Sequence, residues 1–421
     1  MHVIVKGGTT KLTGYQWKLF VFLSVASFFE GYDFLALTQI LPNLRADMGL
    51  DKADAGILVA AINLGTVVAY LLVRQADRWG RRRVLTVTIA GYTFFTFLTG
   101  LSWDGYSFAV AQFAARVFLI GEWATAMVYA AEEFPAHRRG MVIGMISGFS
   151  SLGAIVCAGV VPLLLKLPIT NPMNGHLVGW RAVYFAGIVP LLLLAFARRN
   201  LRESTRFAAA GDGAHQRRPL AAIFSTPYRR RTVQMALIWG VTYICSQNAV
   251  TFWKDFATNE RGLSDAAVGG AITIAALVSM PMVFAVGPLL DWVGRKRGAV
   301  IVFLLGGAGT FFSYTFHGRW PLTGALIFGI FGASAVLPVL NAFTAELFPT
   351  ELRGDAFAWS NNLLGRIGYV ASPLLVASLA EVYSWGAIVR LTAIANLIAL
   401  ALIFALLPET SGRELEETSA L

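Results

Sequence analysis

The sequence predicts an all-α polytopic membrane protein with twelve transmembrane helices in two pseudo-symmetric six-helix halves. Of its 421 residues, 56% are hydrophobic and 14% are charged, whereas soluble proteins carry about 25% charged residues. The apolar residues form continuous blocks of about 20, the length that crosses a hydrocarbon core. Because these blocks do not alternate between apolar and polar residues, a membrane β-barrel is excluded. The third observation is an internal repeat.

Two loops recur at one offset in the chain. Asp77 and Gly80 have counterparts in Asp291 and Gly294, 214 residues later. A second group keeps the same offset: Glu132, Pro135, Arg139 and Gly140 correspond to Glu346, Pro349, Arg353 and Gly354. A repeat of this length indicates a duplicated half-protein and not a solenoid motif.

Twelve apolar spans follow one another, and the first six correspond to the last six under the same shift. The spans are 17–41, 55–73, 84–102, 106–131, 141–165, 180–198, 232–257, 265–288, 299–317, 322–346, 356–381 and 385–407. They predict an N-terminal half over 1–198 and a C-terminal half over 232–407. The arginine-rich segment 199–231 is predicted to be a cytoplasmic linker, partly an amphipathic helix at the lipid headgroups. A polar tail, 408–421, ends the sequence.

The net charge of +10 reports orientation in the membrane. Most Lys and Arg residues fall in the loops on one side of the predicted spans, which is the pattern of cytoplasmic loops. Both termini are therefore predicted to be cytoplasmic, and no nucleic-acid partner is expected. No Asn-x-Ser/Thr sequon occurs in the sequence, which favours a bacterial cytoplasmic (inner) membrane. Cys157 and Cys245 lie inside apolar spans, so neither a disulfide nor a metal site is expected.

The loop Gly287–Arg297 reads G-P-L-L-D-W-V-G-R-K-R. It fits the signature G-x-x-x-D-x-x-G-R-K, and the chain as a whole resembles the major facilitator superfamily. The resemblance implies that the loop aspartate caps a helix start and that the arginines join the two halves on the cytoplasmic side, since a carboxylate accepts from free N–H groups and pairs with arginine. The residues expected to have this conformational role are Asp77, Arg78, Gly80, Arg81, Glu132, Glu133, Arg139, Asp291, Gly294, Arg295, Glu346 and Arg353.

Further motifs narrow the branch of this superfamily. Glu30–Asp33 (E-G-Y-D) is similar to the D-G-x-D of aromatic-acid and sialate proton symporters. Arg116–Trp123 resembles the R-x-x-x-G-G-E-W of metabolite and sialate symporters, with an isoleucine in place of one glycine. Gly365–Gly368 (G-R-I-G) resembles aromatic-acid symporters. The segments 201–206 and 408–413 resemble sugar porters, which keeps a sugar substrate open.

Acids inside apolar spans are the candidates for binding a proton. A buried charge costs several kcal/mol unless it is paired or hydrated, so ionisable groups in spans mark functional sites. Glu30 and Asp33 are i,i+3 neighbours on one helical face, and such a pair titrates as a unit. We predict proton coupling at Asp33, Glu30 and Glu122. The alternative is that these acids pair with arginines and only fix helix packing.

Two arginines are the candidates for binding an anionic substrate. At 1.5 Å per residue, Arg116 and Arg366 lie roughly 15 Å from the membrane surface, near the midplane. Arg366 is the stronger candidate, because a guanidinium presents two parallel donors to a carboxylate; a structural ion pair with Glu30 or Asp33 is the alternative. Other polar and aromatic residues are predicted to complete the site: Tyr32, Tyr243, Gln247, Asn248, Asn341, Asn361 and Trp359.

These residues predict proton-coupled import (symport) of a small organic anion, an aromatic or other monocarboxylate, by alternating access. We expect a monomer in the lipid bilayer, with the proton as coupling ion and no other cofactor. A sugar porter is the main alternative. A drug–proton antiporter is weaker, because Phe149 replaces the proline of the antiporter glycine motif. The sequence offers no catalytic constellation, so an enzyme is not expected.

Overall fold

The computed structural model describes residues 12–134, 136–167, 169, 179–197, 201–203 and 220–411. In these residues every regular element is helical and no strand is present. The first half contains α1 Gly14–Met48, α2 Lys52–Trp79, α3 Arg81–Leu101, α4 Gly105–Glu133, α5 Ala136–Leu164 and α6 Trp180–Ala197.

The second half consists of shorter helices, several of which continue directly into the next. They are η2 Leu220–Ser225, α8 Arg229–Thr251, α9 Trp253–Asp255, η3 Phe256–Glu260, α10 Asp265–Phe284, α11 Val286–Val293, α12 Arg295–Ser313, α13 Arg319–Glu346, α14 Thr350–Phe357, η4 Ala358–Gly365, α15 Arg366–Val382, α16 Trp385–Leu391 and α17 Ala393–Leu406. With consecutive pieces joined and the short η2 left aside, the described residues form twelve helical rods, one for each predicted span. Nine helices among them are long and apolar enough to cross a membrane, and the predicted all-α membrane fold is confirmed.

Local sequence explains where the first helices begin and end. α1 runs past the predicted end of its span and stops at Gly49, which has a left-handed conformation with φ of 64°. Thr13 starts α1 through a capping box, and Asp51 and Asp104 start α2 and α4 in the same way. Such caps satisfy the N–H groups that the first turn of a helix leaves free.

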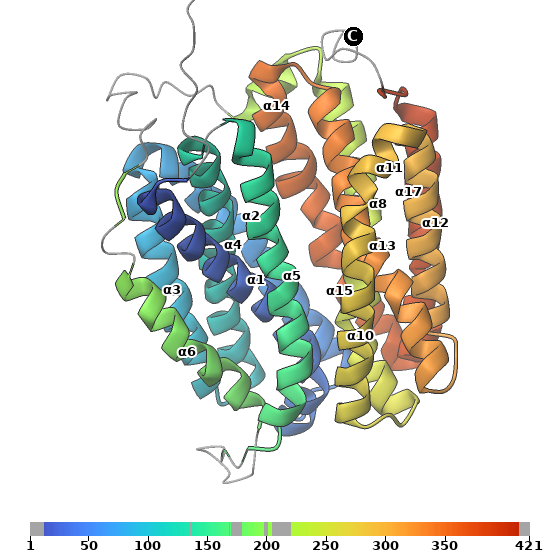
Figure 1. The fold of residues 1–421 in the computed structure, drawn as a ribbon. Coiled ribbons are helices and arrows are strands. Elements are labelled where there is room, and N and C mark those ends of the chain that lie inside the picture. Colours follow the sequence, from blue (N-terminus) through green and yellow to red (C-terminus); the bar gives the residue numbers. More distant parts are fainter. Residues whose placement is uncertain are drawn as a thin grey trace, which may run out of the picture.

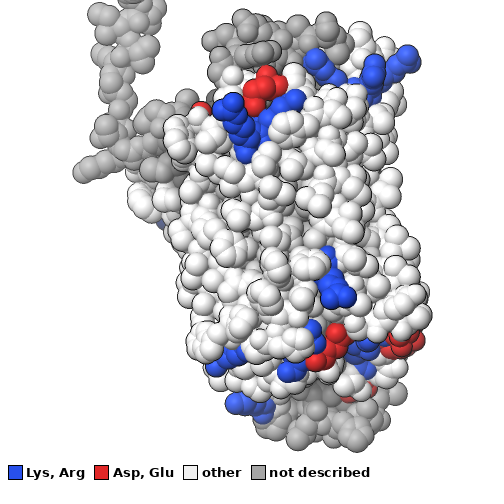
Figure 2. Space-filling model, turned by 90° about the vertical axis from the view of Figure 1, so that its right-hand side faces the viewer, with Lys and Arg blue, Asp and Glu red and all other residues white. Residues whose placement is uncertain are grey.

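The two halves lie side by side, with α1–α6 (blue to green) on one side of Figure 1 and α8–α17 (yellow to red) on the other. We call the end at which α17 finishes the cytoplasmic end and the opposite end the outer end, following the orientation predicted from the sequence. In Figure 2 the charged side chains gather mainly towards these two ends, with a largely uncharged band between them. Lipid tails cover a surface of this kind.

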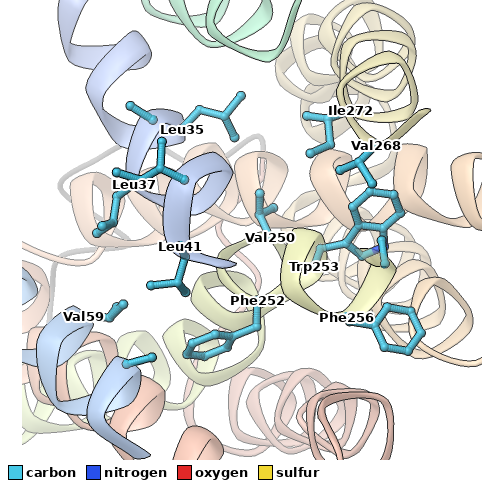
Figure 3. Close-up of a cluster of buried hydrophobic side chains, with 14 of the residues drawn as sticks. Leu35, Leu37, Leu41, Val59, Val250, Phe252, Trp253, Phe256, Val268 and Ile272 are labelled. Carbon is cyan, nitrogen blue, oxygen red and sulfur yellow. The ribbon is translucent and has the colours of Figure 1, made fainter. Parts of the chain in front are cut away.

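One cluster of buried apolar side chains is shared by both halves. It includes Leu41 and Val59 of the first half and Phe252, Trp253 and Ile272 of the second, all near the outer ends of their helices (Figure 3). The other described clusters stay within one half: one is built from η2 and the helices after it, and two from the helices before it. The halves are therefore joined by a common core at the outer end and have separate cores elsewhere.

Polar contacts reinforce this outer junction. Arg45 of α1 forms an ion pair with Asp255 of α9 in the other half. Lys52 of α2 donates a 3.0 Å hydrogen bond from its ammonium group to the carbonyl of Ala380 in α15. Because Asp255 is only 1% exposed, its ion pair is shielded from water and is stronger than a surface pair. The outer end is closed by charge pairing as well as by apolar packing.

α5 and α10 meet at the outer end and separate towards the cytoplasmic end. Gly269 of α10 lies so close to α5 that an added Cβ would be 2.4 Å from the ring of Pro162. Farther along the same two helices, an apolar groove of about 550 Å³ is lined by Gly144, Met145, Gly148, Phe149, Leu152, Met280 and Phe284. Along this seam the two halves are in contact at one end and apart at the other.

Within the first half, α1 and α5 cross at glycines. A Cβ added to Gly31 would lie 1.8 Å from the carbonyl oxygen of Ser150, and one added to Gly153 would lie 1.9 Å from that of Phe28. Because backbone meets backbone here, no side chain can move aside to make room. The crossing also fixes Glu30, the residue before Gly31, next to α5.

Gly31→Ala is expected to lower the thermal stability of the purified protein. The added methyl group forces two backbones apart, and overpacking of this kind costs about 1–3 kcal/mol. The measurement is the apparent melting temperature in detergent micelles. Gly144→Ala is the control, because it adds the same methyl group to α5 where no atom lies within 4 Å. Equal melting temperatures for the two variants would contradict the close crossing.

Candidate functional site

Asp33 of α1 and Arg116 of α4 form an ion pair inside the first half. Asp33 Oδ2 and Arg116 Nη2 are 3.4 Å apart, and the two side chains are 3% and 4% exposed. At this depth either charge alone would cost several kcal/mol, so removal of one partner leaves the other uncompensated. Of the two predicted midplane arginines, Arg116 and not Arg366 is the partner of Asp33.

Glu30 lies one turn before Asp33 and faces α5. The hydroxyl of Ser150 donates a hydrogen bond to its carboxylate. Glu30 also interacts electrostatically with Arg116 and Asp33 and, across the interface, with Arg366. Within the described part of the chain, Glu30 has no ion-pair partner of its own. It lies between the paired charges of the first half and the arginine of the second.

Arg366 is held by two aromatic rings and not by a carboxylate. Its guanidinium carbon lies 5.0 Å from the ring centroid of Tyr243 and 4.7 Å from that of Tyr369, which is within the range of cation–π interactions. Arg366 makes no ion pair with a described residue, and its Nε has no hydrogen-bond partner among them. Arg366 is half-buried, and its two Nη groups make no hydrogen bond to a described residue, so they are available to an anion.

The helix that carries Arg366 changes its winding just before this residue. η4 is a π-helix, a form that is rare in proteins and frequent at functional sites. Asn361 of η4 accepts a 2.6 Å hydrogen bond from the hydroxyl of Tyr243, which ties η4 to α8 beside the arginine. Gln247 lies one turn after Tyr243 on the same face of α8 and is buried. These residues line the second half's side of the site.

Glu122 lies apart from this group. It is buried on α4 and accepts a 2.5 Å hydrogen bond from the hydroxyl of Thr88 on α3. Six residues separate Glu122 from Arg116, so the two side chains point to different faces of the helix. A role of Glu122 in proton binding stays a prediction.

The remaining candidates for substrate binding have other contacts. Tyr32 donates to a backbone carbonyl of α6 at 3.1 Å, and Asn248 donates to a serine hydroxyl of α15 at 3.0 Å. The ring of Trp359 packs edge-on against that of Phe224 in η2, with 4.8 Å between centroids. Asn341 is exposed on α13. The structure does not bring these four side chains into the group around Arg366, and their substrate role stays a prediction.

The repeated loops at the cytoplasmic end form the same ion pair twice. Arg81 and Glu132 are 2.8 Å apart, and their counterparts Arg295 and Glu346 are also 2.8 Å apart. Each pair lies within its own half: the first pair in the N-terminal half and the second in the C-terminal half. The second carboxylate bound by Arg295, that of Asp291, belongs to the same half as well. Among the described residues, Arg295 pairs only with carboxylates of its own half, so the expected role of the arginines in joining the halves stays a prediction.

Carboxylates from the linker and the tail cap the helices that follow these loops. Glu203 accepts hydrogen bonds from the first two N–H groups of α3 at 2.8 and 3.3 Å. Glu409 accepts from the first two of α12, both at 2.9 Å. The capping role expected of Asp291 therefore belongs to Glu409, because Asp291 lies on the preceding helix and pairs with Arg295. Glu203 and Glu409 both lie in the segments that resemble sugar porters, 201–206 and 408–413. The resemblance drew attention to these segments but did not indicate that the two acids cap helices.

Backbone geometry explains the loop glycines. Gly80 and Gly294 have φ of 87° and 93°, values that residues with a side chain rarely adopt. Arg353 donates to a backbone carbonyl at 3.4 Å, and the backbone carbonyl of Glu133 accepts from Gln16 at 3.0 Å. The predicted conformational residues whose side chains lie outside the described part of the chain are Asp77, Arg78 and Arg139.

The electrostatic environment of Glu409 favours its charged form. Burial alone works against the charge, but hydrogen bonds from the N–H groups of Lys296, Ser411 and Arg295 outweigh it, so the pKa of Glu409 is lowered from its usual value of 4.5. The tail is thus attached to the start of α12 by an ionised carboxylate, which also interacts favourably with the helix dipole.

Two related helical halves that meet around a buried charged site define a membrane transporter and not an enzyme. The family model described as Major Facilitator Superfamily matches residues 23–368 and 236–420. The chain belongs to the major facilitator superfamily.

Several proteins similar to this chain are bacterial and are named as transporters. A putative metabolite transport protein of Haemophilus influenzae is 28% identical over 97% of this chain and 100% of its own. A gallate transporter of Pseudomonas putida is 25% identical over 86% of this chain and 85% of its own. Three further relatives are 23 to 25% identical, and each match covers at least 85% of this chain and of the relative. They are a sialic acid transporter of Escherichia coli, and a cis,cis-muconate transport protein and a niacin transporter of Acinetobacter baylyi.

Solved structures share the fold. A bacterial homologue of the human lysosomal transporter Spinster superposes with a TM-score of 0.76 at 13% identity, covering 94% of this chain and 97% of its own. A D-xylose–proton symporter gives a TM-score of 0.74 at 17% identity, covering 95% and 100%. At this identity the likeness concerns the fold alone.

Glu409→Gln is expected to loosen the tail at the start of α12, because an amide accepts more weakly there than a carboxylate. Hydrogen exchange of the Arg295 and Lys296 amides should become severalfold faster at neutral pH, since a helix cap contributes about 1 kcal/mol. Glu414→Gln makes the same charge change in the tail and is the control.

The wild-type protein should show the same loosening in acid. Because the pKa of Glu409 is lowered on folding, its stabilising contribution is present above 4.5 and is lost as the pH falls through the lowered value. Amide exchange, corrected for its intrinsic pH dependence, should therefore accelerate below pH 4.5 in the wild type and not in Glu409→Gln. Identical profiles would contradict the cap.

Proposed function

We propose that this transporter imports a small organic anion, an aromatic or other monocarboxylate, together with a proton. The anion binds at Arg366, and the proton binds to the acids of the first half, Asp33 and Glu30. The two halves, 1–198 and 232–407, rock around this site so that it opens to one side at a time. Both termini lie in the cytoplasm, and the membrane is the inner membrane of a bacterium.

The guanidinium of Arg366, which makes no ion pair with a described residue, is the observation that carries this proposal. Its charge interacts with that of Glu30 without an ion pair, so its donors are left for a ligand. A guanidinium matches a carboxylate with two parallel hydrogen bonds. The rings of Tyr243 and Tyr369 hold its face, so the edge is left for the ligand.

Charge balance supports the coupling to a proton. When Asp33 and Glu30 are ionised, their two negative charges offset the positive charges of Arg116 and Arg366. A bound carboxylate adds one negative charge, and the site then returns to neutrality only if one acid takes up a proton. In a low-dielectric interior this neutrality is worth several kcal/mol, so anion and proton bind together.

The named substrates of the relatives support an anion. Gallate, cis,cis-muconate, niacin and sialic acid all carry a carboxyl group. A sugar porter is the second candidate, since the segments 201–206 and 408–413 resemble sugar porters and a xylose–proton symporter shares the fold. The arginine at the centre of the site favours the anion, because a guanidinium matches a carboxylate with two parallel hydrogen bonds.

The test uses purified protein in liposomes with a pH-sensitive dye trapped inside. Niacin, gallate, cis,cis-muconate, sialic acid, xylose and a lipophilic cation are added in turn, and protein-free liposomes control for leak of the neutral acids. The expected result is protein-dependent acidification of the interior with one or more of the carboxylates and not with xylose.

Two other outcomes would replace this function. A signal with xylose and none with the four acids would make the chain a sugar porter, and Arg366 would then have a structural role. Alkalinisation of the interior on adding the cation would indicate antiport of a drug-like molecule.

Arg366→Lys is expected to raise the apparent KM for the transported acid by roughly tenfold or more, since a hydrogen bond to a charged group contributes about 1.5–3 kcal/mol and lysine lacks the second parallel donor. Uptake of labelled acid over a concentration series measures it. Arg390→Lys, at a half-buried position of α16, is the control and should keep the wild-type KM. An unchanged KM in Arg366→Lys would argue for a structural arginine.

A further inference from the structure

Tyr369 lies where α15 of the second half meets α2 of the first. Its ring packs on the guanidinium of Arg366, with 4.7 Å between the guanidinium carbon and the ring centroid. Its backbone carbonyl accepts a 3.4 Å hydrogen bond from the side chain of Asn63 on α2. Tyr369 is 7% exposed. The residue therefore contacts the proposed substrate arginine and is attached to the opposite half.

Aromatic packing holds the ring of Tyr369. Farther along the same two helices, towards the outer end, a Cβ added to Gly56 of α2 would lie 2.4 Å from the Cβ of Ala377 on α15, so α2 and α15 are in close contact there. The ring of Tyr243 stands edge-on to that of Tyr369, at 5.3 Å between centroids and 79° between planes. The ring of Tyr369 therefore packs against both the guanidinium of Arg366 and the ring of Tyr243.

On its other side, Tyr369 interacts with the charged pair of the first half. Arg116 interacts electrostatically with Tyr369 as well as with Asp33 and Glu30. Its ion pair with Asp33 is long, at 3.4 Å, and its Nε has no hydrogen-bond partner among the described residues. The hydroxyl of Tyr369 likewise makes no hydrogen bond to a described residue. Since a tyrosine hydroxyl can donate one hydrogen bond and accept another, it can serve an anion at Arg366 and the guanidinium of Arg116 together.

We propose that Tyr369 is the positioning residue that couples anion binding at Arg366 to protonation of Asp33 in the opposite half. Its hydroxyl donates to the bound carboxylate and accepts from Arg116, which draws Arg116 away from Asp33. A buried aspartate that loses its counter-charge takes up a proton, and this proton travels with the anion. The inference rests on the proposed proton-coupled function and names the residue that links its two sites.

The groups around Asp33 explain why its proton uptake depends on the position of Arg116. The titratable and charged groups that interact with it are Glu30 and Tyr32 on α1, Tyr92 on α3, Arg116 on α4, Cys157 on α5 and Tyr184 on α6. Arg116 is the one cation among these described groups. Its displacement therefore removes the positive charge that favours the ionised form of the aspartate.

The experiment compares exchange with accumulation in liposomes that contain the full-length protein. Labelled niacin, gallate, cis,cis-muconate and sialic acid are each used in two assays: exchange at equal concentrations on both sides, and uptake driven by an imposed pH gradient. Tyr369→Phe keeps the ring on Arg366 and removes the hydroxyl. Because the hydroxyl contacts the bound carboxylate, we expect a raised apparent KM for exchange but a maximal exchange rate within about twofold of the wild type. The inside-to-outside ratio should fall to about one, as in an uncoupled carrier.

Tyr243→Phe is the matched control. It removes a hydroxyl from the other ring on Arg366, but this hydroxyl binds Asn361 of the same half. We expect a higher apparent KM and an unchanged accumulation ratio. Asp33→Asn, which cannot take up a proton, provides the uncoupled reference.

The outcomes separate this inference from the proposed function. Full accumulation by Tyr369→Phe overturns the role of Tyr369 and leaves proton symport intact. Loss of exchange at saturating substrate, together with loss of accumulation, in Tyr369→Phe also overturns it, because the hydroxyl would then be needed for folding or for movement of the substrate itself. Loss of accumulation in both phenylalanine variants would assign the effect to Arg366 itself. Absence of proton-driven accumulation by the wild type with all four acids would overturn the symport function and, with it, this role.

Discussion

The ion pair of Asp33 and Arg116 determines what the rest of the midplane can do. Because each of these charges is answered inside the first half, the acid and the base that remain, Glu30 and Arg366, come from different halves and have no ion-pair partner among the described residues. A molecule that enters between the halves can therefore interact directly with the charges of Glu30 and Arg366. The charge of a ligand and the number of bound protons are therefore linked by the electrostatics of the interior, whichever acid titrates.

Helix packing gives these groups their fixed positions. The glycine contact between α1 and α5 brings Glu30 to Ser150, and the hydrogen bond from Tyr243 to Asn361 holds the π-helical segment in front of Arg366. In each half, the side chains that face the site are thus held in place by contacts within that half. Movement is left to the interface between the halves, where the common core at the outer end forms one boundary of the site.

Much of this was accessible from the sequence, because apolar blocks and a 214-residue repeat are local or periodic signals. They predicted the twelve spans and the position of Asp33, Arg116 and Arg366 inside the membrane. They could not show which arginine pairs with which acid, since this depends on how α1 and α4 are rotated towards each other. The π-helix η4 adds to the difficulty, because a helical wheel with 3.6 residues per turn misplaces every residue beyond it. The cap formed by Glu409 depends on where the tail folds back.

The repeated ion pairs at the cytoplasmic end have a consequence for the transport cycle. Arg81 with Glu132 and Arg295 with Glu346 each neutralise their charges within a single half. When the halves part at this end, these two ion pairs stay intact, and opening carries only a small electrostatic penalty for them. Two self-neutralised surfaces can approach and separate many times with little free-energy difference between the states, which is what a carrier needs in order to turn over.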